Sequence, residues 1–168
     1  MNICIRPEEY KDIQSIDEVT VAAFLDTPYA GHTEQFIINA LRDSGALSIS
    51  LVAEASDKIV GHVALSPVTI SDGTDGWYGL GPISVHPHEQ GRGIGSKLMH
   101  AALVELKNIK ANGCVLLGSP AYYFRFGFIT IDGLVLPDVP PEYFQALLLQ
   151  GDCPRGTVTY HESFTAKG

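Results

Sequence analysis

The segment from residue 77 to residue 118 constrains the fold most, because it combines a strand, a glycine-rich loop, a helix and a second strand. Trp77–Val85 has the composition of a strand, and apolar side chains at helical spacing predict a helix over 93–112. Residues 114–118 are wholly apolar, as in strands buried on both faces of a sheet. A connection of this length joins parallel neighbours by a right-handed crossover. The chain is therefore predicted to have a mixed α/β fold.

Further strands and helices are predicted on either side of this unit. Gly79, Gly81 and Pro82 interrupt the strand before the loop, which indicates a bulge or a splay where a ligand or another backbone approaches. Gly113 is expected to end the long helix as a C-cap. The other expected elements are strands at 2–6, 47–54 and 58–67 (the last extended by 68–71), helices at 7–24 (opened by Pro7) and 33–43, a helical turn at 121–126, a strand near Ile129, a helix at 142–149 and a strand at 157–161.

Composition limits the class of protein. The chain has 168 residues, 45% of them hydrophobic, and we expect one domain, residues 1–168. A net charge of −8 argues against nucleic acid as a partner, because nucleic-acid binders need a basic face. No apolar run approaches the ~18–20 residues of a membrane span, and the first ten residues lack the apolar core of a secretory signal. Three widely spaced cysteines without a CxxC pair predict a cytoplasmic location.

The loop Gln90-Gly91-Arg92-Gly93-Ile94-Gly95-Ser96 lies between the strand and the helix. Its glycines leave backbone N–H groups exposed at a helix N-terminus, where these groups and the helix dipole favour an anion. A dinucleotide fold would need a glycine in place of Leu98, and a nucleoside-triphosphate loop would need Ser or Thr directly after Lys97. An anion site and a tight turn without a ligand both stay open from the loop alone.

Two motifs in order resemble those of one enzyme family. Gln90, Gly93 and Gly95, after the strand, resemble the acetyl-coenzyme A signature of the GNAT N-acetyltransferase superfamily. Residues 119–128, Ser-Pro-Ala-Tyr-Tyr-Phe-Arg-Phe-Gly-Phe, are similar to that family's second motif, a short helix that ends in Gly-Phe. Among its subgroups the chain most resembles the YhbS-like N-acetyltransferases, which carry a Pro-Ala-Tyr-Tyr-x-x-Phe-Gly-Phe run.

The resemblance implies a particular version of the mixed fold. The central sheet would be twisted and mostly antiparallel, with one parallel strand–helix–strand crossover and a splayed central strand. Residues 1–79 would form the N-terminal half and the acceptor loop, residues 80–128 would carry the acetyl-CoA motifs, and residues 129–168 would complete the domain.

The resemblance also implies how acetyl-CoA is bound, without a metal. The backbone of the splayed strand would pair with the pantetheine arm as with an added strand, and the loop amides would hold the pyrophosphate. Ser119 lies at the strand end that meets the pantetheine, where the subgroup more often has an acid. The expected cofactor-binding residues are Ile83, Ser84, Val85, Gln90, Gly91, Arg92, Gly93, Ile94, Gly95, Ser96, Ser119 and Tyr123.

The implied reaction moves an acetyl group from acetyl-CoA to an amine by direct attack, through a tetrahedral intermediate. The backbone N–H near Val85 would polarise the thioester carbonyl, and Tyr123 would protonate the departing sulfur. An ordinary core aromatic is the alternative role for Tyr123. The sequence does not single out the general base, and water relayed to Asp26, His32 or Glu34 stays open.

The partners are less determined than the reaction. The acceptor could be a small amine, a peptide N-terminus or a lysine, and the loop 26–32 and the tail after Phe128 are expected to wall its site. The resemblance suggests a homodimer. His86, His88 and Glu89 do not suffice to predict a metal site. A non-catalytic acyl-CoA sensor is the alternative from another class, and the intact Tyr123 favours the enzyme.

Overall fold

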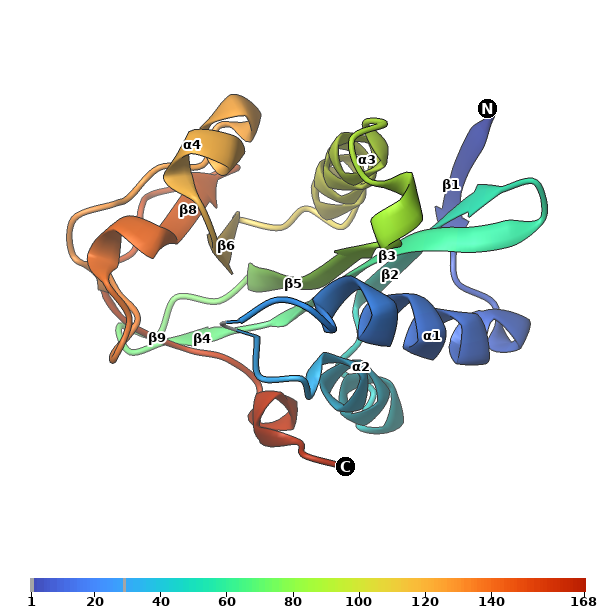
Figure 1. The fold of residues 1–168 in the computed structure, drawn as a ribbon. Coiled ribbons are helices and arrows are strands. Elements are labelled where there is room, and N and C mark those ends of the chain that lie inside the picture. The colour runs from blue at the N-terminus through green and yellow to red at the C-terminus, as the bar shows by residue number, and fades with distance from the viewer. Residues whose placement is uncertain (1, 29) are drawn as a thin grey trace.

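The computed structural model describes residues 2–28 and 30–168, and its main feature is a six-stranded sheet. The strands are β1 (Ile3–Pro7), β2 (Ile49–Ala55), β3 (Lys58–Pro67), β5 (Trp77–Val85), β6 (Gly113–Leu117) and β8 (Phe144–Leu148). Their order is β1-β2-β3-β5-β6-β8, and every neighbouring pair is antiparallel except β5 and β6 (Figure 1). The prediction of a mixed, mostly antiparallel sheet with one parallel crossover is confirmed.

Helices cover both faces of the sheet. They are α1 (Ile13–Phe24), α2 (Glu34–Asp43), α3 (Ile94–Asn108) and the short α4 (Pro120–Tyr123). The first two pack on one face and α3 on the other (Figure 1). Because side chains alternate along a strand, Leu51 and Val63 join the core under α3, whereas Val52 and Ala64 pack with α1 and α2. Among the described residues, no helix combines the length and the apolar character of a membrane span.

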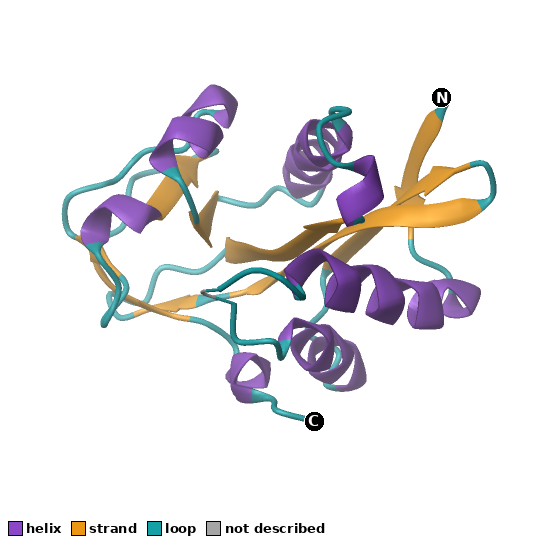
Figure 2. Cartoon of the chain, viewed as in Figure 1, coloured by secondary structure: helices purple, strands orange, loops and turns teal. Residues whose placement is uncertain are grey.

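The two parallel strands separate after a short stretch of pairing. β5 pairs with β6 from Trp77 to Gly79, and the described strands carry no further pair between them. β5 stays paired with β3 as far as Val85, and a bulge places Gly81 and Pro82 opposite a single residue of β3. The second half of β5 therefore has one open edge, and its departure from β6 is visible in Figure 2. This arrangement confirms the predicted splay.

The first helix begins later than the sequence predicts. Pro7 does not open it, because Pro7 is the last residue of β1, and a 3-10 turn at Tyr10–Asp12 precedes α1. The Asp12 carboxylate accepts the backbone N–H of Glu9 at 2.7 Å and the guanidinium of Arg6, also at 2.7 Å. These bonds fix a turn between the strand and the helix, which apolar periodicity alone does not reveal.

The long helix ends earlier than predicted, and Gly113 does not cap it. α3 stops at Asn108, and Lys110 takes the left-handed conformation with φ of 60°. Gly113 is instead the first residue of β6. A Cβ there would lie 2.4 Å from the indole ring of Trp77, so the glycine makes room for that buried side chain. Tertiary packing, rather than helix termination, explains this glycine.

The C-terminal part differs most from expectation. The predicted helix at 142–149 is wrong, because a 3-10 turn at Pro141–Tyr143 leads into β8, which pairs with the otherwise open side of β6. The strand expected near Ile129 is a single bridge to Ala146. Residues 68–71 do not extend β3. Instead a second sheet of order β4-β9-β7 forms from β4 (Thr69–Ile70), β9 (Gly156–Thr159) and β7 (Leu134–Val135).

Candidate active site

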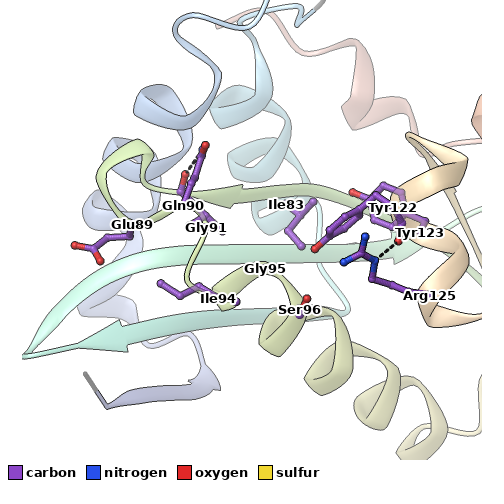
Figure 3. A pocket seen from close by; sticks show the side chains of 12 residues that line it. Ile83, Glu89, Gln90, Gly91, Ile94, Gly95, Ser96, Tyr122, Tyr123 and Arg125 are labelled. Atoms are coloured by element: carbon purple, nitrogen blue, oxygen red, sulfur yellow. Dashed lines mark hydrogen bonds between the residues drawn. The ribbon is translucent and has the colours of Figure 1, made fainter.

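A cavity of about 450 Å³ opens beside the free edge of β5, between the N-terminus of α3 and the α4 segment (Figure 3). Most residues that the sequence analysis assigned to cofactor binding line it: Ile83, Val85, Gln90, Gly91, Gly93, Ile94, Gly95, Ser96 and Tyr123. Ser84, Arg92 and Ser119 were also assigned and do not line it. Glu89, Tyr122 and Arg125 line it and were not assigned. The fold thus brings both sequence motifs to one hollow.

The open edge of β5 presents backbone groups toward this cavity. His86 donates its N–H to Val60 O at 2.8 Å, so its backbone faces β3. Because successive residues of a strand point their backbone groups to opposite sides, those of Val85 and Ile83 face away from β3. Val85 O accepts the side-chain Nε2 of Gln90 at 3.1 Å. Gln90 therefore secures the end of the strand, and the N–H of Val85 faces the open side.

Ser84 faces the opposite side of the sheet. Ser84 lies opposite His62 of the neighbouring strand β3, and both side chains are buried on the side of the sheet covered by α1 and α2. Within the described chain, Ser84 Oγ and His62 Nδ1 have no hydrogen-bond partner. His62 Nε2 lies 2.8 Å from Ser50 Oγ, which also bonds Glu8. This buried histidine was not predicted from the sequence, where its position inside an apolar strand is its one signal.

Glycines shape the wall of the cavity at the start of α3. Gly91 and Gly93 take left-handed conformations with φ of 81° and 79°, and Gly93 is the N-cap of the helix. Such φ values favour glycine over residues with a Cβ. The first amides of an α-helix lack partners inside the helix, so those after Gly93 are available to an anion. A Cβ on Gly95 would lie 3.3 Å from the Tyr122 hydroxyl, which shows how closely α4 approaches this turn.

The charged side chains at the cavity are arranged differently from expectation. Arg92 pairs with Glu89 at 3.2 Å, and its side chain is 56% exposed. Arg125 instead reaches the cavity, with its guanidinium 4.6 Å from the centre of the Tyr122 ring and its Nε donating to Tyr122 O at 2.9 Å (Figure 3). Arg125 is thus the arginine placed at the cavity, whereas Arg92 balances an acid beside it.

Tyr123 and Tyr122 form the wall opposite β5. Their rings meet edge to face, with centroids 4.9 Å apart and an interplanar angle of 89°. Burial, and to a smaller extent the neighbouring Tyr122, raises the pKa of the Tyr123 phenol above its ordinary value. Tyr123 therefore stays protonated at neutral pH and can donate a proton. Of the aromatic residues nearby, Phe126 and Phe128 are buried, whereas Phe124 is 70% exposed.

The candidate bases lie elsewhere in the described chain. Glu34, in the first turn of α2, accepts the N–H of Gly31 at 3.1 Å, and its second carboxylate oxygen is buried without a hydrogen-bond partner among the described residues. His32 and Asp26 are exposed. None of the three lines the cavity. The loop 26–32, expected to wall the acceptor site, includes position 29, which lies outside the described residues.

This arrangement suits an elongated ligand with three kinds of group. Amides along the ligand could pair with the open backbone of β5, an anionic group could accept the amides at the start of α3, and a leaving group near Tyr123 could take a proton. In the part of the chain that the structure describes, no group of three His, Cys, Asp or Glu side chains could hold a metal ion.

Known proteins share both the sequence pattern and the fold. Residues 46–130 match the model of the acetyltransferase (GNAT) domain. The uncharacterized N-acetyltransferase YhbS of Escherichia coli K12 is 32% identical over 114 residues, 67% of this chain and 68% of the relative. The crystal structure of a GNAT family acetyltransferase from Brucella melitensis in complex with acetyl-CoA matches with a TM-score of 0.87 at 45% identity, over 97% of this chain and 98% of that one. The structure of E. coli YhbS in complex with CoA matches with a TM-score of 0.89 at 30% identity, over 100% and 94%.

Proposed function

This chain belongs to the GNAT family of acetyltransferases, which are acyl-CoA-dependent enzymes, and from that premise we propose that it transfers an acetyl group from acetyl-CoA to a primary amine. The single observation that carries the proposal is the cavity, where the open edge of β5, the amides of α3 and the protonated Tyr123 converge. Each of these three features matches one part of the thioester substrate.

The residues at the cavity fit acetyl-CoA. Pantetheine contains two amides, which can pair with the open N–H and C=O of Ile83 as a further strand would, while the N–H of Val85 stays free for the thioester carbonyl. The pyrophosphate is an anion, which the amides of Gly91 to Ser96 and the helix dipole stabilise. Arg125 adds positive charge in a protein whose net charge is −8. Ser84 turns its side chain away from this site, and Ser119 supplies the N-cap of α4.

The proposed reaction passes through a tetrahedral intermediate. The neutral amine nitrogen attacks the thioester carbon, and the carbonyl oxygen gains negative charge that the N–H of Val85 stabilises. The carbon–sulfur bond then breaks, and Tyr123 donates its proton to the sulfur, giving free CoA and the N-acetylated acceptor. The amine nitrogen loses a proton to solvent or to a base, and a proton from solvent or that base restores the Tyr123 hydroxyl. Asp26, His32 and Glu34 stay candidates for that base.

Replacing Tyr123 with phenylalanine tests the proposal. Tyr123→Phe keeps the ring and removes only the hydroxyl, so kcat should fall about a hundredfold, in the range of general acid catalysis, while KM for acetyl-CoA changes little. Thiol release with a panel of amines measures both. Tyr10→Phe, at a side chain that is 91% exposed, is the matched control. Unchanged turnover of the Tyr123 variant, at saturating acetyl-CoA, would remove Tyr123 from the mechanism.

One further outcome separates the enzyme from a non-catalytic sensor. If the wild-type chain binds CoA by calorimetry and acetylates none of a broad panel of small amines, peptides and lysines, it is a sensor rather than an enzyme. We also propose a cytoplasmic location, which the three free cysteines support.

We propose a homodimer as well, and size-exclusion chromatography with light scattering tests it.

A further inference from the structure

We propose that Gly118 and Gln145 are positioning residues that together form the seat of the Tyr123 ring, an inference that rests on the proposed function. Gly118 follows the last residue of β6, and Gln145 lies in β8. Neither residue lines the cavity. Both are argued to act through the phenol of Tyr123, whose distance from the sulfur determines whether it can donate its proton.

Gly118 leaves the space that the Tyr123 ring occupies. A Cβ at residue 118 would lie 2.2 Å from Cε2 and 2.8 Å from Cδ2 of Tyr123, which is a steric clash for carbon atoms that are not bonded to each other. The φ angle of Gly118 is not in the left-handed region, so its backbone conformation is open to any residue. The position therefore requires glycine because of the tyrosine ring and not because of the backbone.

Gln145 fixes the peptide against which that ring rests. Its side chain is buried, with 1% exposure, and its Nε2 donates to Gly118 O at 2.9 Å. On the other side, the N–H of Gly118 donates to Tyr143 O at 2.9 Å. Both polar groups of the Gly118 backbone are thus held by β8 and by Tyr143, the residue directly before it. The next carbonyl, Ser119 O, accepts the N–H of Tyr123 at 3.0 Å, which connects the fixed peptide to the tyrosine backbone.

This geometry gives β8 a role in the reaction that its sequence does not reveal. Gln145 lies outside residues 46–130, which match the acetyltransferase domain model. The hydrogen bond from Gln145 is partly buried, and its removal would take away the side-chain donor that holds Gly118 O, so the peptide could move. A displacement of about 1 Å in a reacting group can lower a rate about a hundredfold.

A comparison of two backgrounds tests the inference. Gly118→Ala and Gln145→Leu should each lower kcat about tenfold or more, with KM for acetyl-CoA within about threefold of the wild-type value. In the Tyr123→Phe background each should lower kcat by less than about twofold, because the hydroxyl they misplace is already absent. The phenyl ring keeps the carbon atoms that collide with a methyl group at position 118, so the loss of thermal stability should be equal in both backgrounds. Gln150→Leu, at an exposed glutamine beyond the end of β8, is the matched control and should leave kcat unchanged.

The results separate the inference from the proposed function. Equal losses of kcat in the two backgrounds would show a general structural effect and overturn the inference, as would full activity of both single variants. If Tyr123→Phe itself retains full kcat, Tyr123 is not the general acid, and the positioning role of Gly118 and Gln145 is refuted together with it. If Gly118→Ala does not fold, Gln145→Leu, which adds no atom near the ring, decides the question by the same comparison.

Discussion

The buried histidine His62, which lies in β3 beside β5, should make folding stability fall in mild acid. His62 has no exposed surface and lies opposite Ser84 of β5. The residues on either side of Ser84, Ile83 and Val85, line the cavity. Burial lowers the pKa of His62 to about 4, although the Glu8 carboxylate, 3.9 Å away, acts in the opposite direction; Arg42 lowers it further. His62 is therefore neutral in the folded protein at neutral pH.

The magnitude follows from the difference between the two states. In the unfolded chain this histidine has a pKa of 6.5, so below about that pH the unfolded state binds a proton that the folded state does not. The stability that neutral His62 contributes is therefore fully present above pH 6.5, the pKa in the unfolded chain, and is lost as the pH falls toward the pKa in the folded protein. Unfolding free energy should drop by about 2 kcal/mol between pH 7 and pH 5, and by about 3 kcal/mol at pH 4. The Glu8 carboxylate adds to the loss of stability only as the pH falls below about 4.5, the pKa of an ordinary glutamate. Burial acts to raise the pKa of Glu8, but hydrogen bonds from Arg42 and Ser50 hold it below that value.

Urea denaturation of wild type and His62→Gln at pH 7 and at pH 5 measures the difference. Glutamine cannot be protonated and can still bond Ser50, so the variant should lose about 2 kcal/mol less than wild type over this range. His100→Gln, at an exposed histidine of α3, controls for the loss of a histidine as such. Parallel losses in wild type and His62→Gln would refute the reasoning, because the acid sensitivity would then come from other groups.

Two more predictions rest on contacts that the sequence does not show. Arg125→Ala should raise KM for acetyl-CoA about tenfold, because Arg125 reaches the cavity. Arg92→Ala should raise KM by less, because Arg92 pairs with Glu89 instead. Equal increases in KM for the two variants, measured in steady-state assays, would contradict this order. Gly113→Ala should lower the unfolding free energy by about 1–3 kcal/mol, since the new methyl group would meet the Trp77 ring at 2.4 Å. Denaturation measures it, and a fully stable variant would show that the indole has room to move.

Local chemistry allowed much of the fold to be predicted from the sequence. Ser56 and Asp57 have positive φ values of 51° and 64°, as expected of the turn between β2 and β3. The left-handed Gly91 and Gly93 begin α3 at the predicted place. The glycine and proline in β5 mark the bulge and the splay that follows. The glycines and the proline set the local conformation by their own backbone preferences, and Ser56 and Asp57 join two strands that are adjacent in the chain, so no distant partner was needed.

Distant partners decided the rest. Residues 144–148 are apolar enough for a helix or a strand, and only the unpaired side of β6 selects the strand. That strand brings Gln145 to Gly118, a contact between residues 27 positions apart. Likewise Arg125, which lies more than thirty positions after Arg92 in the chain, reaches the cavity, whereas Arg92 does not line it. The sequence by itself determined where the chain turns and which backbone lies open, because those properties are local. Which side chains reach the open backbone was decided by tertiary structure, because pairing and burial depend on segments that meet only in the folded chain.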